Sequence, residues 1–191
     1  MSLRAALPIT TFYESVCWMK KVLWLTLFCL TSAITTPAHA GTGWRYWGYF
    51  QAAPGATQWS YALTGPTTVI PDGSVEGWAF TFSGDDVADA ATPKITPQFS
   101  RICGTTKAVA QKKRVGLVVD FGPAALRPQG EKLPRAIVKC LVLDKDATGV
   151  EVLNAALKVR YAASGYVCGI NSYPIKECGL QIKTPRTLVK K

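Results

Sequence analysis

The chain has 191 residues, with 22 lysines and arginines against 12 aspartates and glutamates, which gives a formal net charge of +10. Beyond residue 40 the basic residues are scattered, and only 112–114 and 190–191 form runs there. This distribution favours a solvated surface over one built to attract anionic headgroups or wall polymers, and it lacks the basic stripe with interleaved aromatics that is typical of nucleic-acid binding.

Residues 1–40 have the three-part layout of a cleavable signal peptide. A basic pair at 20–21 precedes the uncharged apolar segment 22–34, and Ala38 and Ala40 form an A-x-A cleavage site. A helix over 22–34 would rise about 20 Å, which is less than the roughly 30 Å hydrocarbon core that a transmembrane anchor must cross. We therefore expect cleavage after Ala40 and a secreted, extracytoplasmic protein of the cell envelope.

The prefix 1–18 is a poor start for such a signal, because it carries Arg4, Pro8 and Glu14 among bulky apolar residues. Met19 opens a better basic region, which indicates that the assigned start codon lies too far upstream. An unusually long basic region is the alternative.

Residues 41–184 are predicted to form a single small disulfide-braced α+β domain, followed by a disordered basic tail at 185–191. Much of the domain has apolar residues at every second position, which is typical of strands. About six strands are expected, at 44–51, 59–63, 75–82, 113–122, 136–143 and 166–170. The run at 113–122 is almost continuously apolar, as in a strand that is buried on both faces.

One main helix is predicted over 150–158. Thr148 is a suitable N-cap, and Glu151, three residues later, completes a capping box. Leu153 and Leu157 then fall on one apolar face of the helix.

Four of the six cysteines follow the predicted cleavage site: Cys103, Cys140, Cys168 and Cys178. An even number in an exported domain is best explained by two disulfides, and the lack of a C-x-x-C pair disfavours the metal-binding alternative. Four cysteines permit three pairings. Turn formers at 169, 171 and 174 favour a Cys168–Cys178 bond, which leaves Cys103–Cys140 to close a loop of about 37 residues.

Catalytic chemistry is not indicated. The single histidine, His39, precedes the cleavage site, so the exported part can contain neither a Ser-His-Asp or Cys-His arrangement nor a Cys/His zinc site. Aspartates such as Asp72 and Asp85 lie in turns and loops, where they serve solubility and turn geometry rather than paired acid–base chemistry or calcium binding. We therefore expect a non-enzymatic domain with no metal or cofactor.

Aromatic residues are dense between 44 and 82: Trp44, Tyr46, Trp47, Tyr49, Phe50, Trp59, Tyr61, Trp78, Phe80 and Phe82. Strand 44–51 carries aromatics on both faces, more than one core face requires. Either all of these rings pack internally, or one face is an exposed platform for a flat or amphipathic ligand. In the binding interpretation the ligand residues are Arg45, Trp47, Tyr49 and Gln51. The face with Trp78, Phe80 and Phe82 is expected to be buried.

Several segments occur in an order that resembles a known family: WRYWGYFQ at 44–51, DGSVEGWAF at 72–80, KRVGLVVDFG at 113–122 and YVCGINSYP at 166–174. Together they resemble an uncharacterised family of exported actinobacterial proteins over about 44–180. Members of that family are often encoded beside energy-coupling-factor transporters of the vitamin or cobalt type, and many end in a membrane or wall anchor. The last residues here, KTPRTLVKK, have no apolar tail and depart from that pattern.

A second similarity concerns shorter segments. Residues 146–157 followed by 166–171 resemble the strand–helix–strand part of transcobalamin C-terminal-like β-grasp modules, and 59–61 and 72–78 resemble their two closing strands. The closing strands come last in that family and first here, so the resemblance implies a circularly permuted β-grasp domain. Such a domain would present a ligand, a corrinoid or another vitamin, to a membrane transporter.

The first hypothesis is therefore an exported binding or accessory module, a ligand-presenting partner of a vitamin- or cobalt-type membrane transporter, with the aromatic strands as its contact surface. The alternative is a structural or protein-interaction domain of the cell envelope without a small ligand. Nucleic acid is not expected as a partner, nor is a stable transmembrane segment after cleavage.

Overall fold

The computed structural model of the chain describes residues 41–189. In chain order its elements are β1 (Thr42–Ala52), β2 (Ser60–Tyr61), β3 (Val75–Gly84), α2 (Phe99–Cys103), β4 (Lys112–Asp120), the 3-10 helix η1 (Ala124–Leu126), β5 (Ile137–Asp144), α3 (Gly149–Ala156), β6 (Val159–Tyr161), β7 (Val167–Ile170) and β8 (Leu180–Lys183). The predicted α+β class and single main helix are confirmed, and each predicted strand has a counterpart. The prediction missed β6, β8 and the short helix α2. The predicted signal peptide and residues 190–191 lie outside the described residues.

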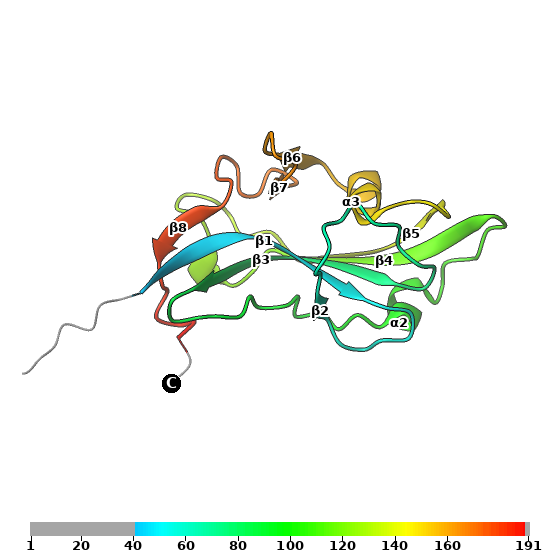
Figure 1. The fold of residues 1–191 in the computed structure, drawn as a ribbon, viewed down its shortest axis with the longest axis horizontal. Coiled ribbons are helices and arrows are strands. Elements are labelled where there is room, and N and C mark those ends of the chain that lie inside the picture. The colour runs from blue at the N-terminus through cyan, green and yellow to red at the C-terminus, as the bar shows by residue number, and fades with distance from the viewer. Residues whose placement is uncertain (1–40, 190–191) are drawn as a thin grey trace, which may run out of the picture. The chain divides into compact units, whose positions relative to one another are not determined.

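A mixed sheet forms the centre of the domain, in the strand order β2-β1-β3-β4-β5 (Figure 1). β1 and β3 are antiparallel and pair from Gly43 to Ala52 of β1. β3 and β4 are parallel, whereas β4 and β5 are antiparallel. The other edge of β1 pairs with β2 at one end and with β8 at the other. β6 and β7 form a separate two-stranded sheet.

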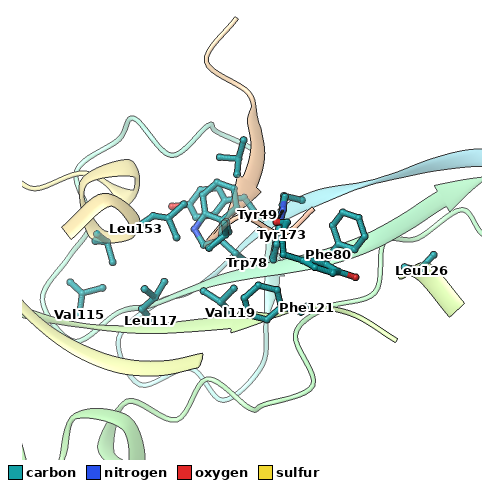
Figure 2. Packing of buried hydrophobic residues seen from close by; sticks show 14 of the residues in the cluster. Tyr49, Trp78, Phe80, Val115, Leu117, Val119, Phe121, Leu126, Leu153 and Tyr173 are labelled. Atoms are coloured by element: carbon teal, nitrogen blue, oxygen red, sulfur yellow. Dashed lines mark hydrogen bonds between the residues drawn. The ribbon is translucent and has the colours of Figure 1, made fainter. Parts of the chain in front are cut away.

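One face of the sheet carries most of the hydrophobic core. Trp78, Phe80 and Phe82 of β3 are buried there, as the sequence predicts. α3 and β7 cover this face, since Leu153 and Ile170 belong to the same cluster of buried side chains. Figure 2 shows this main core, with Leu153 of α3 beside the aromatic rings of β1 and β3.

The opposite face has a smaller core around Ala52, Val75 and Val118. Side chains from outside these strands pack against it: Trp59, Ile95, Phe99 and Ile102. Figure 1 shows α2 on this side of the sheet, away from α3 and β6–β7. Because both faces are covered, nearly every residue of β3 and β4 is buried, which confirms the prediction from the apolar run at 113–122.

Both predicted disulfides are present. Cys103–Cys140 ties the end of α2 to β5, with a Cα–Cα distance of 5.0 Å. Cys168–Cys178 closes the segment after β7, with a Cα–Cα distance of 4.2 Å. The first bond therefore fixes α2, which packs on the smaller core, to the sheet. The second cross-links the chain between β7 and β8.

α3 begins with the predicted capping box. The Thr148 backbone N–H and hydroxyl both donate to Glu151 Oε2, at 2.7 and 2.8 Å. These two hydrogen bonds lower the pKa of Glu151. The helix ends at Ala156, earlier than expected, because Leu157 is already extended and leads into β6.

Residues 185–189, the first part of the predicted tail, follow β8 as a turn. The Leu188 N–H donates to the Pro185 carbonyl at 2.9 Å. The Leu188 side chain packs against the main core. This part of the segment is thus in contact with the domain.

Candidate functional site

The four residues predicted to bind a ligand lie on the face of β1 that meets the main core. Trp47 and Tyr49 are only 3% and 8% exposed. Arg45 is buried and donates through Nε to Glu177 Oε2 at 2.7 Å, within an ion pair. Gln51 is half-buried, and its Nε2 donates to the Tyr49 hydroxyl at 2.8 Å. Of the two interpretations of this face, the structure therefore shows internal packing rather than an exposed platform, because α3 and β7 cover it.

Trp47 and Tyr49 nevertheless form part of the wall of a cavity of about 230 Å³, here named the inner pocket. It lies where the chain after β2 and the turn before β7 meet the main core. Its lining is mostly apolar: Trp47, Tyr49, Tyr61, Ala62, Leu63, Thr64, Gly65, Pro66, Trp78, Gly165, Tyr166 and Val167. Two of the predicted ligand residues are therefore brought together as buried walls, whereas Arg45 and Gln51 are not part of the lining.

Trp78, one of the wall residues, has an unused hydrogen-bond donor. Its ring stacks on Tyr49, with centroids 4.8 Å apart and 27° between the planes. Its Nε1 is buried and has no hydrogen-bond partner within the part of the chain that the structure describes. Trp47 and Trp59 differ, because each donates from Nε1 to a backbone carbonyl, at 3.2 and 2.9 Å. A buried donor without a partner costs on the order of 1–3 kcal/mol, so an acceptor that reached Trp78 Nε1 would be favoured.

A buried carboxyl group lies behind Tyr49. The Tyr49 hydroxyl donates to Oε2 of Glu76, a buried residue of β3, and Oε1 has no partner among residues 41–189. Burial raises the pKa of Glu76, although hydrogen bonds from Tyr49 and Gln51 and the charge of Lys113 oppose the rise. Burial and the neighbouring carboxyl also raise the pKa of Tyr49. Tyr49 therefore stays a neutral donor.

Lys113 of β4 is a second buried cation on this side of the sheet, besides Arg45. Its Nζ donates to the backbone carbonyls of Lys145 and Ala147, at 3.0 and 2.6 Å, and to that of Ile70. Burial lowers the pKa of Lys113, whereas nearby carboxylates, Asp146 first among them, oppose the change. Lys113 therefore holds the loop that precedes α3 and does not reach the inner pocket.

The exposed aromatic side chains of β1 lie on the other face, which the prediction did not select. Trp44 is 52% exposed and Tyr46 is half-buried. Tyr61 of β2 and Tyr166, just before β7, are 52% and 45% exposed. Burial, together with Tyr46 and Tyr61 nearby, raises the pKa of Tyr166 to about 12. The alternation in β1 could have found Trp44 and Tyr46, but nothing local in the sequence joins them to Tyr166.

Two further hollows adjoin these side chains. The loop hollow, of about 400 Å³, lies between β1, β2 and the loop after β3, and it is lined by Tyr46, Phe50, Tyr61, Ala88, Asp89, Ala90 and Thr92. The edge hollow, of about 380 Å³, lies near the beginning of β1 and is lined by Trp44, Tyr46, Ser83, Tyr166, Cys178 and Gly179. Together with the inner pocket they form the candidate site.

The family model of the SCO2322-like domain matches residues 39–183, a range that includes every helix and strand described above. The chain belongs to the SCO2322-like domain family. No curated protein and no solved structure matches it.

Between residues 41 and 189 of this SCO2322-like domain, no cluster of three or more His, Cys, Asp or Glu side chains could hold a metal ion. In the same range no helix is long and apolar enough to cross a membrane. The three hollows offer aromatic faces together with tyrosine hydroxyls, which can both donate and accept hydrogen bonds.

Proposed function

We propose that this SCO2322-like domain is an exported, non-enzymatic binding module that holds a small neutral ring in the inner pocket. One observation carries the proposal: the pocket has aromatic walls, and one of them is Trp78, whose buried Nε1 has no partner among residues 41–189. Aromatic walls favour a flat or amphipathic ring through contact area. The unused donor favours an acceptor atom on that ring.

Charge supports a neutral ligand. No lysine, arginine, aspartate or glutamate among the described residues lines the inner pocket. Behind its wall, burial favours the uncharged forms of Glu76 and Tyr49. An ion that entered the inner pocket would lose its hydration without gaining a partner of opposite charge. The free-energy cost would be much larger than that of burying a neutral group.

The size of the inner pocket bears on the partner that the family resemblance implies, a vitamin- or cobalt-type membrane transporter. Its volume of about 230 Å³ is below the roughly 300–1,000 Å³ of pockets for drug-sized ligands. A corrinoid would therefore place only a side group in the pocket, and a smaller vitamin-like ring suits it better. Crosslinking in intact cells, read by mass spectrometry, tests the partner: crosslinks to a transporter component support it, and crosslinks only to other envelope proteins favour the interaction-domain alternative.

A screen of neutral one-ring compounds by ligand-observed NMR tests the binding proposal. Thr64 is an exposed residue of the pocket lining, so Thr64→Trp should fill the entrance and abolish binding. Thr67→Trp places the same ring at an exposed position outside the lining and should leave binding unchanged. The proposal fails when no compound binds the wild-type protein, or when both variants bind as well as the wild type.

A further inference from the structure

The three hollows meet around three tyrosines. The inner pocket shares Tyr61 with the loop hollow and Tyr166 with the edge hollow, and the loop and edge hollows share Tyr46. Each hollow has a volume of a few hundred cubic ångströms, about 230, 400 and 380 Å³. A single small ring occupies one such hollow, so three adjoining hollows suit a chain of ring-shaped units.

The surface at these hollows combines open aromatic faces with hydroxyl groups. Trp44, Tyr61 and Tyr166 are each about half exposed, so their rings are available for stacking. The Tyr46 hydroxyl lies 3.2 Å from Ser83 Oγ, and each of these groups can also donate to or accept from a ligand. Such a surface matches units that have one apolar face and several hydroxyl groups.

Charge restricts the ligand further. The chain carries 22 lysines and arginines, but none of those between residues 41 and 189 lines any of the three hollows. An anionic polymer would need such cations to pair with. The charged side chain that does line a hollow is the exposed Asp89. Because a carboxylate only accepts hydrogen bonds, a ligand group that reaches it has to be a donor.

We propose that the three hollows bind successive units of a neutral sugar chain, a claim that rests on the proposed function because one unit occupies the inner pocket. A pyranose ring places its C–H face on an aromatic ring, and its hydroxyls donate to Asp89 and exchange hydrogen bonds with the tyrosines. Proline-rich peptides also bind aromatic-lined grooves, but their prolines have no N–H and so offer fewer donors to Asp89 than a sugar unit with several hydroxyls. The acceptor in the loop hollow therefore favours the sugar.

A panel of neutral oligosaccharides, from single sugars to hexasaccharides of several linkages, tests the proposal by isothermal titration calorimetry on the full protein. Affinity should rise at least about tenfold, or 1.4 kcal/mol, from a single sugar to the trisaccharide. Trp44→Ala, which removes a ring of the edge hollow, should cancel that gain. Val109→Ala is the control, because Val109 is 51% exposed and lies outside all three hollows. Tyr166→Ala should weaken every sugar, because Tyr166 lines two hollows.

The outcomes separate this inference from the proposed function. When one-ring compounds bind the inner pocket but no neutral oligosaccharide gains affinity with length, the sugar-chain inference is overturned and the binding module stands. A proline-rich peptide or an anionic polymer that binds more tightly than every neutral sugar also overturns it, as does a length-dependent gain that Trp44→Ala leaves intact. When neither rings nor sugars bind, both proposals fail.

Discussion

Trp44 and Trp47 lie on the same strand but on opposite faces of the sheet, so their removal should have unequal costs. Trp47 packs against Phe80 and Phe121, with ring centroids 5.5 and 5.4 Å apart. Trp47→Ala should therefore lower the free energy of unfolding by about 3–5 kcal/mol. Because Trp44 is half exposed, Trp44→Ala should lower it by only about 0.5–1 kcal/mol. Urea denaturation of the two variants measures the difference. Equal losses would contradict the faces assigned to them.

Gly77 is a position where the packing requires a glycine. A Cβ added there would lie 2.6 Å from Cζ3 of Trp59, whose ring covers the smaller core. Gly77→Ala should destabilise the fold by about 1–3 kcal/mol, the usual cost of overpacking. The loss should shrink in a Trp59→Ala background, since the two residues are in contact. Gly65→Ala is the matched control, because a Cβ there meets nothing within 4 Å; a loss as large as that of Gly77→Ala would refute the packing argument.

Glu76 should make stability depend on pH. Burial raises its pKa above the ordinary value of 4.5, so above that pH the folded protein keeps a proton that the unfolded chain has released. The stability from the protonated form is present at low pH and is lost as the pH rises through the raised pKa. Glu76→Gln stays neutral, so its stability relative to the wild type should increase as the pH rises above the ordinary carboxyl pKa of 4.5. Tyr49 and Lys113 are present in both the wild type and the variant, so the comparison reports on Glu76. A difference in stability that does not change with pH would contradict the raised pKa of Glu76.

At the scale of single elements, the sequence predicted correctly those features that depend on neighbouring residues alone. The Thr148–Glu151 capping box spans one helical turn, so the start of α3 could be predicted without knowledge of the rest of the fold. β8 was missed because it is four residues long and pairs with residues 42–45, at the far end of the domain in sequence. α2 was missed because five residues are too few for a helical pattern. Its place depends on contacts with the smaller core and on Cys103–Cys140.

The two disulfides should differ in what they contribute. Their sequence separations are 37 and 10 residues, and on the chain-entropy model the longer loop gives about 1 kcal/mol more stability. Replacing Cys103 and Cys140 by alanine should therefore lower the melting temperature more than replacing Cys168 and Cys178. Calorimetry of the two double variants decides the order. A larger drop for the Cys168–Cys178 pair would mean that native contacts, rather than loop length, dominate.

At the scale of the whole molecule, the sequence pattern predicted two faces for β1 but not which of them would be covered. That choice depends on α3 and β7, which come late in the chain and pack on the Trp47 face. The candidate site has the same limitation, because the inner pocket joins β1, β3, the chain after β2 and the turn before β7. The hydrophobic periodicity within one strand cannot predict that these distant segments meet. The circularly permuted β-grasp and the transporter partner stay predictions.

The binding proposal is tested most directly by the indole N–H signals in a ¹H–¹⁵N correlation spectrum, recorded as the neutral one-ring compounds are added. Trp78 Nε1 has no partner among residues 41–189, whereas Trp47 and Trp59 already donate to backbone carbonyls. Ligand binding in the inner pocket should shift the Trp78 signal downfield, as a new hydrogen bond does, and leave that of Trp59 in place. A bound ligand that leaves Trp78 unmoved, or that shifts Trp59 equally, would contradict the site.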